Sequence, residues 1–202
     1  MKHEIGFIGD IHGFPPALKG AFRKLNELGI PEVILLGDYV NKGPDSRGVI
    51  EFLSSWNDPE LHIVPLRGNH DHEFLKSLES GDVRPLLKLS GAPTIRSYVE
   101  GDVGPDVFQE LSQAVPESHR QFLRSLPRTF HRDGIVGTHD PQSFVGEEFH
   151  VSAHRYVGDK PEIGLHFAGI DTGCGIGGLL TVFLWPSREF FQFTEDGQPI
   201  SL

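Results

Sequence analysis

The 202-residue chain is poor in cysteine, in basic residues and in long apolar segments. A single cysteine, Cys174, excludes an intrachain disulfide and a zinc site built on cysteine pairs. Lys and Arg total 18 against 28 Asp and Glu, a formal charge of −10, so we expect no binding to bulk nucleic acid or membrane surfaces. The longest apolar run, residues 178–185, is far shorter than a membrane span of ~20 residues. With no apolar stretch after Met1, these features predict a cytoplasmic protein.

The length and composition are those of one ordinary globular domain. A chain of 202 residues predicts a single domain over residues 1–202. Hydrophobic residues make up 38% and charged residues 23%, which argues against disorder and fibrous repeats. The surplus of carboxylates occurs together with 11 histidines, and these two residue types are the common protein ligands of divalent cations.

The first 70 residues alternate short apolar runs with helical stripes. Leu18, Phe22, Leu25 and Leu28 recur at helical spacing, and the second helix is expected to be capped by Asp45 or Ser46. This βαβαβ order predicts a parallel sheet with right-handed crossovers. The strands are expected at residues 5–8, 33–36 and 61–66, and the helices at 15–28 and 45–53.

The pattern changes after this start. Residues 73–132 read as a helical insertion, because short helical stretches alternate there with loops rich in Gly and Pro. Strand signals then return with tight turns, which predicts a second, mixed or antiparallel sheet. The helices are expected at 73–78, 106–114 and 117–126, and the strands at 135–137, 149–153, 165–170, 179–185 and 189–193.

Polar donors follow five of the predicted strands. In open α/β sheets ligands bind beyond the carboxyl ends of the strands, so these donors are expected at one place. All are oxygen or nitrogen donors and none is a thiolate, which favours Mn²⁺, Fe or Zn²⁺ over a soft metal. The donors are Asp10 and His12, Asp38, Asn69, His139 and His154, and His150 is the alternative to His154.

Three motifs at these strand ends carry a resemblance. They are GD-x-HG at residues 9–13, GDxV-x-x-G at 37–43 and RGNH at 67–70. They resemble the calcineurin-like metallophosphoesterases, in the phosphoprotein phosphatase branch, and most of all the bacterial and phage-type serine/threonine phosphatases and the symmetrical diadenosine tetraphosphatases. The resemblance extends over about residues 5–185. It implies an α/β fold, a four-layer αββα sandwich with a helical insertion.

The resemblance also implies a site with two divalent metal ions, Mn²⁺ first and Fe or Zn²⁺ as alternatives. Asp38 matches the carboxylate that bridges both ions, His70 the general acid and Arg67 a phosphate contact. Two such ions can supply a hydroxide that attacks phosphorus directly, while His70 protonates the leaving group. The ligands implied are Asp10 and His12 for the first ion, and Asn69, His139 and His154 for the second.

The sequence departs from the family pattern after Val40. Asn41 and Lys42 stand where the family has Asp and Arg. Asn41 carries no charge to stabilise a protonated His70, and Lys42 lacks the bidentate fork that suits phosphate oxygens. We therefore hypothesise a preference for leaving groups of low pKa, such as aryl phosphates or pyrophosphate bonds. Arg155, which follows His154, is a further candidate phosphate contact.

Three functions remain open from the sequence. The first is hydrolysis of phosphomonoesters, on a phosphoprotein or a small molecule. The second is hydrolysis of dinucleoside polyphosphates such as diadenosine tetraphosphate. The third, indicated by Asn41 and Lys42, is a metal-binding interaction module with little activity. The expected partner is thus a phosphorylated substrate or nucleotide, and the sequence carries no indication of oligomeric state.

Overall fold

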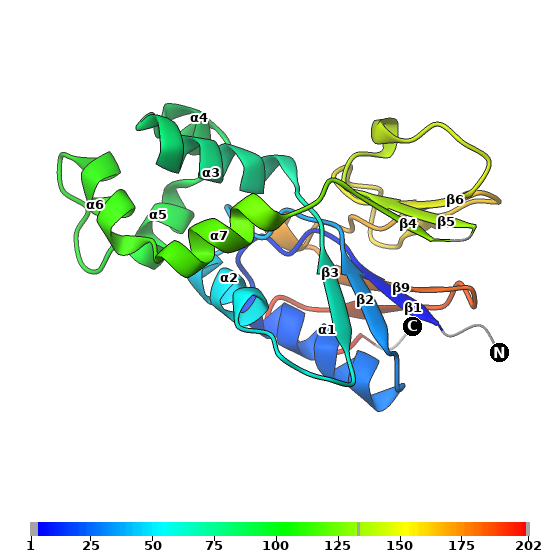
Figure 1. Cartoon of the computed structure of the whole chain (residues 1–202). Coiled ribbons are helices and arrows are strands. Elements are labelled where there is room, and N and C mark those ends of the chain that lie inside the picture. The colour runs from blue at the N-terminus through cyan, green and yellow to red at the C-terminus, as the bar shows by residue number, and fades with distance from the viewer. Residues whose placement is uncertain (1–3, 133, 201–202) are drawn as a thin grey trace.

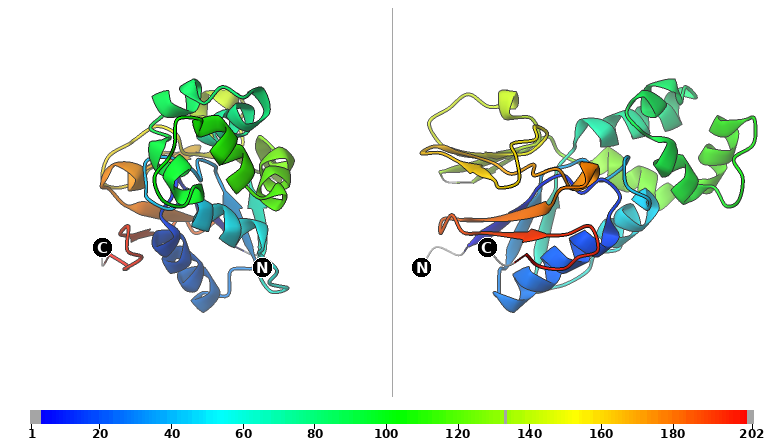
Figure 2. Two further views of the ribbon diagram at one scale, coloured as in Figure 1. Left: turned by 90° about the vertical axis from the view of Figure 1, so that its left-hand side faces the viewer. Right: turned by 180° about the vertical axis from the view of Figure 1, so that it is seen from behind.

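Two five-stranded sheets lie face to face in the computed structural model, which describes residues 4–132 and 134–200. Figure 1 shows the second sheet stacked on the first, with a group of helices beyond one end of both. The views in Figure 2 place the helix α1 against the outer face of the first sheet. In the described part of the chain, no helix is long and apolar enough to cross a membrane.

The first sheet has the strand order β10-β9-β1-β2-β3. Its parallel part, β1 to β3, is the predicted βαβαβ start, with α1 and α2 as the crossovers. The predicted cap is also confirmed, because the Asp45 carboxylate accepts from Gly48 N at 2.7 Å. The bounds are β1 Ile5–Ile8, α1 Pro15–Glu27, β2 Glu32–Leu35, α2 Ser46–Ser54, β3 His62–Pro65, β9 Leu180–Trp185 and β10 Phe190–Phe193.

The membership of β9 and β10 corrects the sequence analysis, which assigned them to the second sheet. β9 instead pairs antiparallel with β1, with Ile5 opposite Trp185, and β10 pairs with β9. The hairpin closes the free edge of β1, and the buried β9 contributes Phe183 to the interface between the sheets. Apolar runs mark a strand as buried, but they carry no information on which sheet buries it.

The second sheet has the strand order β4-β5-β6-β8-β7 and is mixed, one of the two arrangements predicted. β5, β6 and β8 are parallel, and the short edge strands β4 and β7 are antiparallel to their neighbours. β4 and β7 are absent from the predicted elements. The bounds are β4 Thr129–Arg132, β5 Ile135–Thr138, β6 Phe149–Ser152, β7 Glu162–Ile163 and β8 Phe167–Gly169.

The two sheets enclose an apolar core of their own. Phe7 of β1 lies edge-on to Phe130 of β4, with ring centroids 6.2 Å apart. Phe149 of β6 stacks on Phe183 of β9, with an interplanar angle of 4°. Alternate residues of a strand point to opposite faces, so Phe7 faces the second sheet while Ile8 packs in the core beneath the helices. This packing holds the carboxyl ends of β1, β2, β5 and β6 at one edge.

The outer layers differ between the sheets. α1 and α2 cover the first sheet, whereas the described segment between β5 and β6 holds only the 3₁₀ helix η1 (Pro141–Ser143). From this segment Phe144 packs on His150, with ring centroids 5.0 Å apart, and on His131 at 6.3 Å. The α/β fold with two stacked sheets is therefore confirmed, whereas in the described residues a loop with one 3₁₀ helix stands where the αββα prediction placed the second α layer.

The helical insertion lies beyond the carboxyl ends of β1–β3 (Figure 1). Its first helix begins four residues earlier than predicted, at Asn69, and so carries two predicted site residues. Leu78, Tyr98 and Leu123 of this region belong to the same buried cluster as the apolar residues of α1 and α2. The bounds are α3 Asn69–Ser80, α4 Arg84–Lys88, α5 Ala92–Tyr98, α6 Val107–Ala114 and α7 Glu117–Ser125, of which α4 and α5 were not predicted.

Candidate functional site

The predicted donors meet where strands of both sheets end. Because parallel strands place their carboxyl ends at the same edge, loops far apart in sequence converge there. The first sheet contributes the segments after β1, β2 and β3, and the second those after β5 and β6. The residues brought together are Asp10, His12, Asp38, Asn69, His70, His139 and His154.

The backbone of this edge is strained. Seven non-glycine residues in the described part of the chain have a positive φ, a conformation that costs an L residue free energy. Five of them belong to the predicted site, with φ between 46° and 72°. Such strain persists only where the surroundings enforce it, and it gathers at functional sites. The five are His12, Asp38, Asn41, Lys42 and His154.

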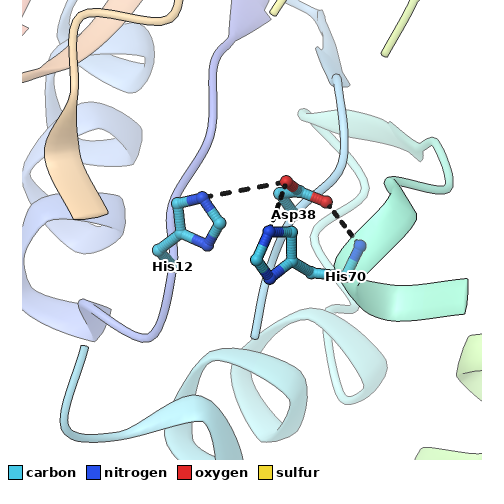
Figure 3. Close-up of side chains that lie close together, drawn as sticks. All are labelled: His12, Asp38 and His70. Atoms are coloured by element: carbon cyan, nitrogen blue, oxygen red, sulfur yellow. Dashed lines mark hydrogen bonds and ion pairs between the residues drawn. The ribbon is translucent and has the colours of Figure 1, made fainter. Parts of the chain in front are cut away.

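The first cluster of donors comprises His12, Asp38 and His70, whose ligand atoms all lie within 4.8 Å of one another. Figure 3 shows both imidazole rings turned toward the Asp38 carboxylate. Nε2 of His12 lies 3.7 Å from Asp38 Oδ2, and Nε2 of His70 lies 3.8 Å from the same oxygen. Asp10 Oδ2 completes the cluster at 3.6 Å from His12 Nε2.

The second cluster shares Asp38 with the first and adds His139 and His154. His139 Nε2 lies 3.4 Å from Asp38 Oδ1, 3.1 Å from His154 Nδ1 and 2.9 Å from Asn69 Oδ1. Asp38 is thus the carboxylate common to both clusters, the position expected of a bridging ligand. The alternative His150 does not enter the cluster, because its Nε2 bonds to Thr138 Oγ1 at 2.8 Å.

Two histidines present lone pairs to these clusters. Nδ1 of His12 donates to the Val40 carbonyl at 2.9 Å, and Nδ1 of His139 donates to the Leu36 carbonyl at 3.1 Å. With the proton on Nδ1, each Nε2 carries a lone pair toward its cluster. The Asn69 oxygen and the Asp38 carboxylate therefore lie next to His139 Nε2 with no proton between them, because all three atoms are hydrogen-bond acceptors. A cation among these atoms satisfies all of them, and backbone-oriented imidazoles are typical metal ligands.

The charge balance of the site also fits divalent cations. Burial and the neighbouring carboxylates of Asp10 and Asp71 raise the pKa of Asp38 well above its ordinary value. Burial also acts on Asp10, but His12 and His139 outweigh it and lower the pKa of Asp10 to about 2. Crowded buried carboxylates repel one another, and a cation between them removes that cost. The residues present thus fit the two divalent ions that the family implies.

Asp71 is a residue that the sequence analysis missed. Its carboxylate is buried and accepts backbone N–H groups from Asp38 at 2.8 Å, Tyr39 at 2.9 Å and Gly68 at 2.9 Å. These bonds fix the loop after β2 against the start of α3, and so fix the orientation of Asp38. The available signal was an acidic residue directly after the RGNH motif, at the N-terminus of a helix.

Asn41 contacts His70, the predicted general acid. Its Nδ2 donates to His70 Nδ1 at 2.8 Å, and its Oδ1 accepts from the Thr94 hydroxyl at 2.8 Å. Thr94 is in turn 2.8 Å from the Ser46 hydroxyl, and neither residue was a predicted site residue. Burial, with His12 and Lys42 nearby, lowers the pKa of His70 to about 3. The imidazole is therefore neutral, with its proton on Nε2.

The three predicted phosphate contacts lie in different surroundings. Lys42 Nζ donates to His12 Nε2 at 2.7 Å, inside the first cluster. Arg67 Nη2 donates to the Leu123 and Arg124 carbonyls, at 3.3 Å and 3.0 Å, at the end of α7. Arg155 is exposed, and its side chain bonds to no group in the described residues. Phosphate binding by these residues stays a prediction.

Asp171 is a further buried carboxylate near the site. It follows β8 and accepts from Gly173 N at 3.0 Å. Burial, and secondarily the negative charge of Asp10, raises the pKa of Asp171 to about 6. The sequence analysis assigned no role to Asp171.

Two curated relatives match the chain. A symmetrical bis(5'-nucleosyl)-tetraphosphatase of Nitrosospira multiformis is 23% identical over 159 residues, which cover 72% of this chain and 55% of the relative. The chain thus spans about half the length of that relative. The asymmetrical bis(5'-nucleosyl)-tetraphosphatase PrpE of Oceanobacillus iheyensis is also 23% identical, and the match covers 93% of this chain and 90% of the relative.

Solved structures and a family profile agree on the fold. A crystal structure assigned to a diadenosine tetraphosphatase superposes with a TM-score of 0.69 at 21% identity, and the match covers 98% of this chain and 94% of that one. A metallophosphoesterase of Sphaerobacter thermophilus has a TM-score of 0.59 at 15% identity, with 98% and 88% covered. The profile of the calcineurin-like phosphoesterase family matches residues 3–169. The chain therefore belongs to the calcineurin-like phosphoesterase family, and its two clusters of candidate metal ligands lie at the strand ends.

Proposed function

We propose that this protein is a divalent-metal-dependent hydrolase of phosphoanhydride bonds, with dinucleoside polyphosphates as its substrate class. The observation that carries the proposal is the hydrogen bond from the Asn41 amide to His70 Nδ1. The Asn41 N–H group points at His70 Nδ1. If the ring also took up a proton at Nδ1, that proton would point at the Asn41 N–H group and would have no hydrogen-bond acceptor. His70 is thereby held as a neutral hydrogen-bond donor through Nε2, rather than as an imidazolium.

This state of His70 decides which leaving groups depart readily. An imidazolium transfers its proton easily, whereas a neutral imidazole donates a hydrogen bond and keeps its proton. A serine alkoxide needs protonation, since its conjugate acid is nearly as weak as water, whose pKa is about 15.7. A phosphate leaving group does not, because its second pKa is about 6. Anhydride cleavage thus tolerates Asn41, while cleavage of alkyl phosphate esters is impaired.

The proposed metal centre uses the residues of the two clusters. Asp10, His12 and Asp38 would hold one ion, and Asp38 would bridge to a second ion on the other cluster. Bound there, Mn²⁺, or alternatively Fe or Zn²⁺, supplies activation of a water molecule and neutralises charge on the phosphate oxygens. The chain needs no nucleophilic side chain for this reaction. The ligands of the second ion would be Asn69, His139 and His154.

The two curated relatives support the anhydride assignment, because both are named as bis(5'-nucleosyl)-tetraphosphatases. We carry only the class of bond from them to this chain, since one name is symmetrical and the other asymmetrical. Asp10, His12 and Asp38 are buried, whereas Asn69 and His154 are exposed, so a phosphate group can reach the proposed centre from the side of the second cluster. Free nucleotides are cytoplasmic compounds, and a cytoplasmic location remains our prediction.

The second candidate is hydrolysis of phosphomonoesters with a good leaving group. The same Asn41–His70 hydrogen bond favours aryl over alkyl esters, because a phenol has a pKa of about 10. A phosphotyrosine protein or a small aryl phosphate fits this candidate, and a phosphoserine protein fits it less well. A metal-binding module with little activity is the third reading.

A substrate panel with Mn²⁺ separates these functions. The wild-type protein is assayed on diadenosine tetraphosphate, an aryl phosphate and a phosphoserine peptide, with and without chelator. We expect kcat/KM to fall in that order, with all activity lost on chelation. Preferred turnover of the phosphoserine peptide would contradict the proposal. Binding of Mn²⁺ without turnover of any substrate would favour the interaction module.

A further inference from the structure

A cavity of about 230 Å³ opens beside the second metal-ligand cluster. Of its lining residues, His139 belongs to that cluster and Asn69 contacts it, so the cavity borders the proposed metal centre. The others come from the start of α3, from the segment between α7 and β4, and from the loop after β5. We call it the arginine pocket, and it is lined by Arg67, Gly68, Asn69, His72, Arg128, His139, Asp140 and Ser143.

The arginine pocket concentrates positive charge on a protein of formal charge −10. Its lining includes two arginines, Arg67 and Arg128, and also His72. Asp140 is the only carboxylate in the lining, and one of its oxygens already accepts from Gln142 N at 2.9 Å. The pocket therefore favours an anionic group, and guanidinium suits phosphate oxygens.

Both arginines retain hydrogen-bonding capacity. Arg67 donates through Nη2 to two carbonyls at the end of α7, and no other nitrogen of its guanidinium has a partner in the described residues. Arg128 is exposed and enters no ion pair or side-chain hydrogen bond within that part of the chain. The pocket also borders the N-terminus of α3, whose helix dipole adds partial positive charge. A ligand with several acceptor oxygens can use these donors together.

The size and lining of the pocket limit what it can hold. Pockets that bury whole drug-sized ligands are usually ~300–1,000 Å³, so 230 Å³ suits a single small group. The lining contains no Phe, Tyr or Trp, the side chains on which nucleobases stack. A phosphate group therefore fits the pocket better than a nucleoside does.

We infer that the arginine pocket binds a second phosphate group of the substrate, connected to the phosphate that is attacked at the metal centre. The substrate class is then a compound with consecutive phosphates rather than a monoester. Arg128 is the specificity-determining residue, since it lies in the pocket without belonging to the motifs that hold the metal ligands. This inference rests on the proposed function, which it narrows to polyphosphate chains.

The first test compares two substrates in Arg128→Gln. The ratio of kcat/KM for diadenosine tetraphosphate to that for an aryl phosphate should fall by about tenfold, mainly through KM for the tetraphosphate. Arg84→Gln is the matched control, because it removes the same charge from α4, which follows the far end of α3. That variant should leave the ratio unchanged. An unchanged ratio in Arg128→Gln would overturn the inference.

A binding experiment separates this inference from the proposed function. Methylenediphosphonate, a diphosphate analogue that is not hydrolysed, and methylphosphonate are titrated calorimetrically into the Mn²⁺-loaded protein. Arg128→Gln should weaken the diphosphonate about tenfold and the monophosphonate little. Equal weakening of both probes, no weakening, or no preference of the wild type for the diphosphonate would overturn the pocket assignment. A wild type that binds the diphosphonate through Arg128 but cleaves no substrate would refute the proposed function alone.

Discussion

Asn41 Nδ2 lies 2.8 Å from His70 Nδ1 and donates a hydrogen bond to it. The amide cannot rotate freely, because its Oδ1 accepts from the Thr94 hydroxyl on α5. A residue from the loop after β2 and another from the helical insertion thus fix the proton of His70 on Nε2. In the family pattern an aspartate stands at this position and can accept a hydrogen bond from the histidine. This chain replaces an acceptor by a donor, which is the basis of the proposed preference for anhydrides.

Asp38→Asn tests the bridging role that we propose for Asp38. Loss of its charge should lower Mn²⁺-dependent turnover at least about a hundredfold and reduce the Mn²⁺ bound at saturation. Asp102→Asn, an identical change at an exposed position, should leave both unchanged. The measurements are kcat on the preferred substrate and metal content after equilibrium dialysis. Retained activity in Asp38→Asn would refute the assignment of two bridged ions.

Lys42→Met tests the ammonium group that lies inside the first cluster. Because Lys42 Nζ bonds to His12 Nε2, it occupies the lone pair that a metal needs and repels the ion by its charge. Like charges at 4 Å cost about 1 kcal/mol even in water, so we expect Mn²⁺ to bind about tenfold more tightly to the variant. Calorimetric titration of the metal-free protein measures this. Lys76→Met, on the exposed side of α3, is the control, and equal affinities in both variants would contradict the prediction.

Asp71→Ala tests the link between the loop after β2 and α3. The change leaves three buried N–H groups without their acceptor, and we expect the free energy of unfolding to fall by about 2–5 kcal/mol. Asp71→Asn keeps one acceptor oxygen and should lose less. Urea unfolding of the metal-free proteins gives both values. If the two variants lost the same amount, the backbone hydrogen bonds would not be the source of the effect.

Asp171→Asn tests the carboxyl whose pKa is raised to about 6. Between about pH 4, the pKa of this carboxyl in the unfolded chain, and pH 6, the folded protein binds more protons at Asp171 than the unfolded chain does. The free energy of unfolding therefore falls as the pH rises through that range. The neutral variant still accepts from Gly173 N, and in chelator at pH 7 it should be more stable than the wild type by about 1–3 kcal/mol. The gain should vanish near pH 4. A gain that is independent of pH would contradict this account.

Much of the candidate site could be predicted because its position follows from strand order. Short apolar runs that end in Asp, His or Asn predict donors at one edge once the strands are parallel, and Asp10, Asp38 and Asn69 lie there. His139 and His154 reach the same place only because β5 and β6 of the second sheet end at the same edge as β1 and β2 of the first. That sheet was predicted from its apolar runs, and the face-to-face packing of Phe149 on Phe183 supplies the alignment.

The parts that were missed depend on contacts between distant segments. The hairpin of β9 and β10 pairs with β1, more than 170 residues away in sequence, and its apolar pattern would suit either sheet. Thr94 reaches Asn41 only because α5 folds back on the loop after β2, and α5 itself is a helix of 7 residues rich in weak helix formers. The hydrogen bond from the Arg67 guanidinium to a carbonyl of α7 is likewise a contact between distant segments, and the sequence did not indicate it.

Asn41→Asp is the most direct test of the central claim, that an amide behind His70 sets the preference for leaving groups. The measurement is kcat/KM on diadenosine tetraphosphate and on a phosphoserine peptide, both with Mn²⁺, for the wild type and the variant. The account predicts that the variant gains at least about tenfold on the peptide, since general acid catalysis is typically worth ~10²–10⁴-fold, and changes little on the tetraphosphate. Equal changes on both substrates would contradict it.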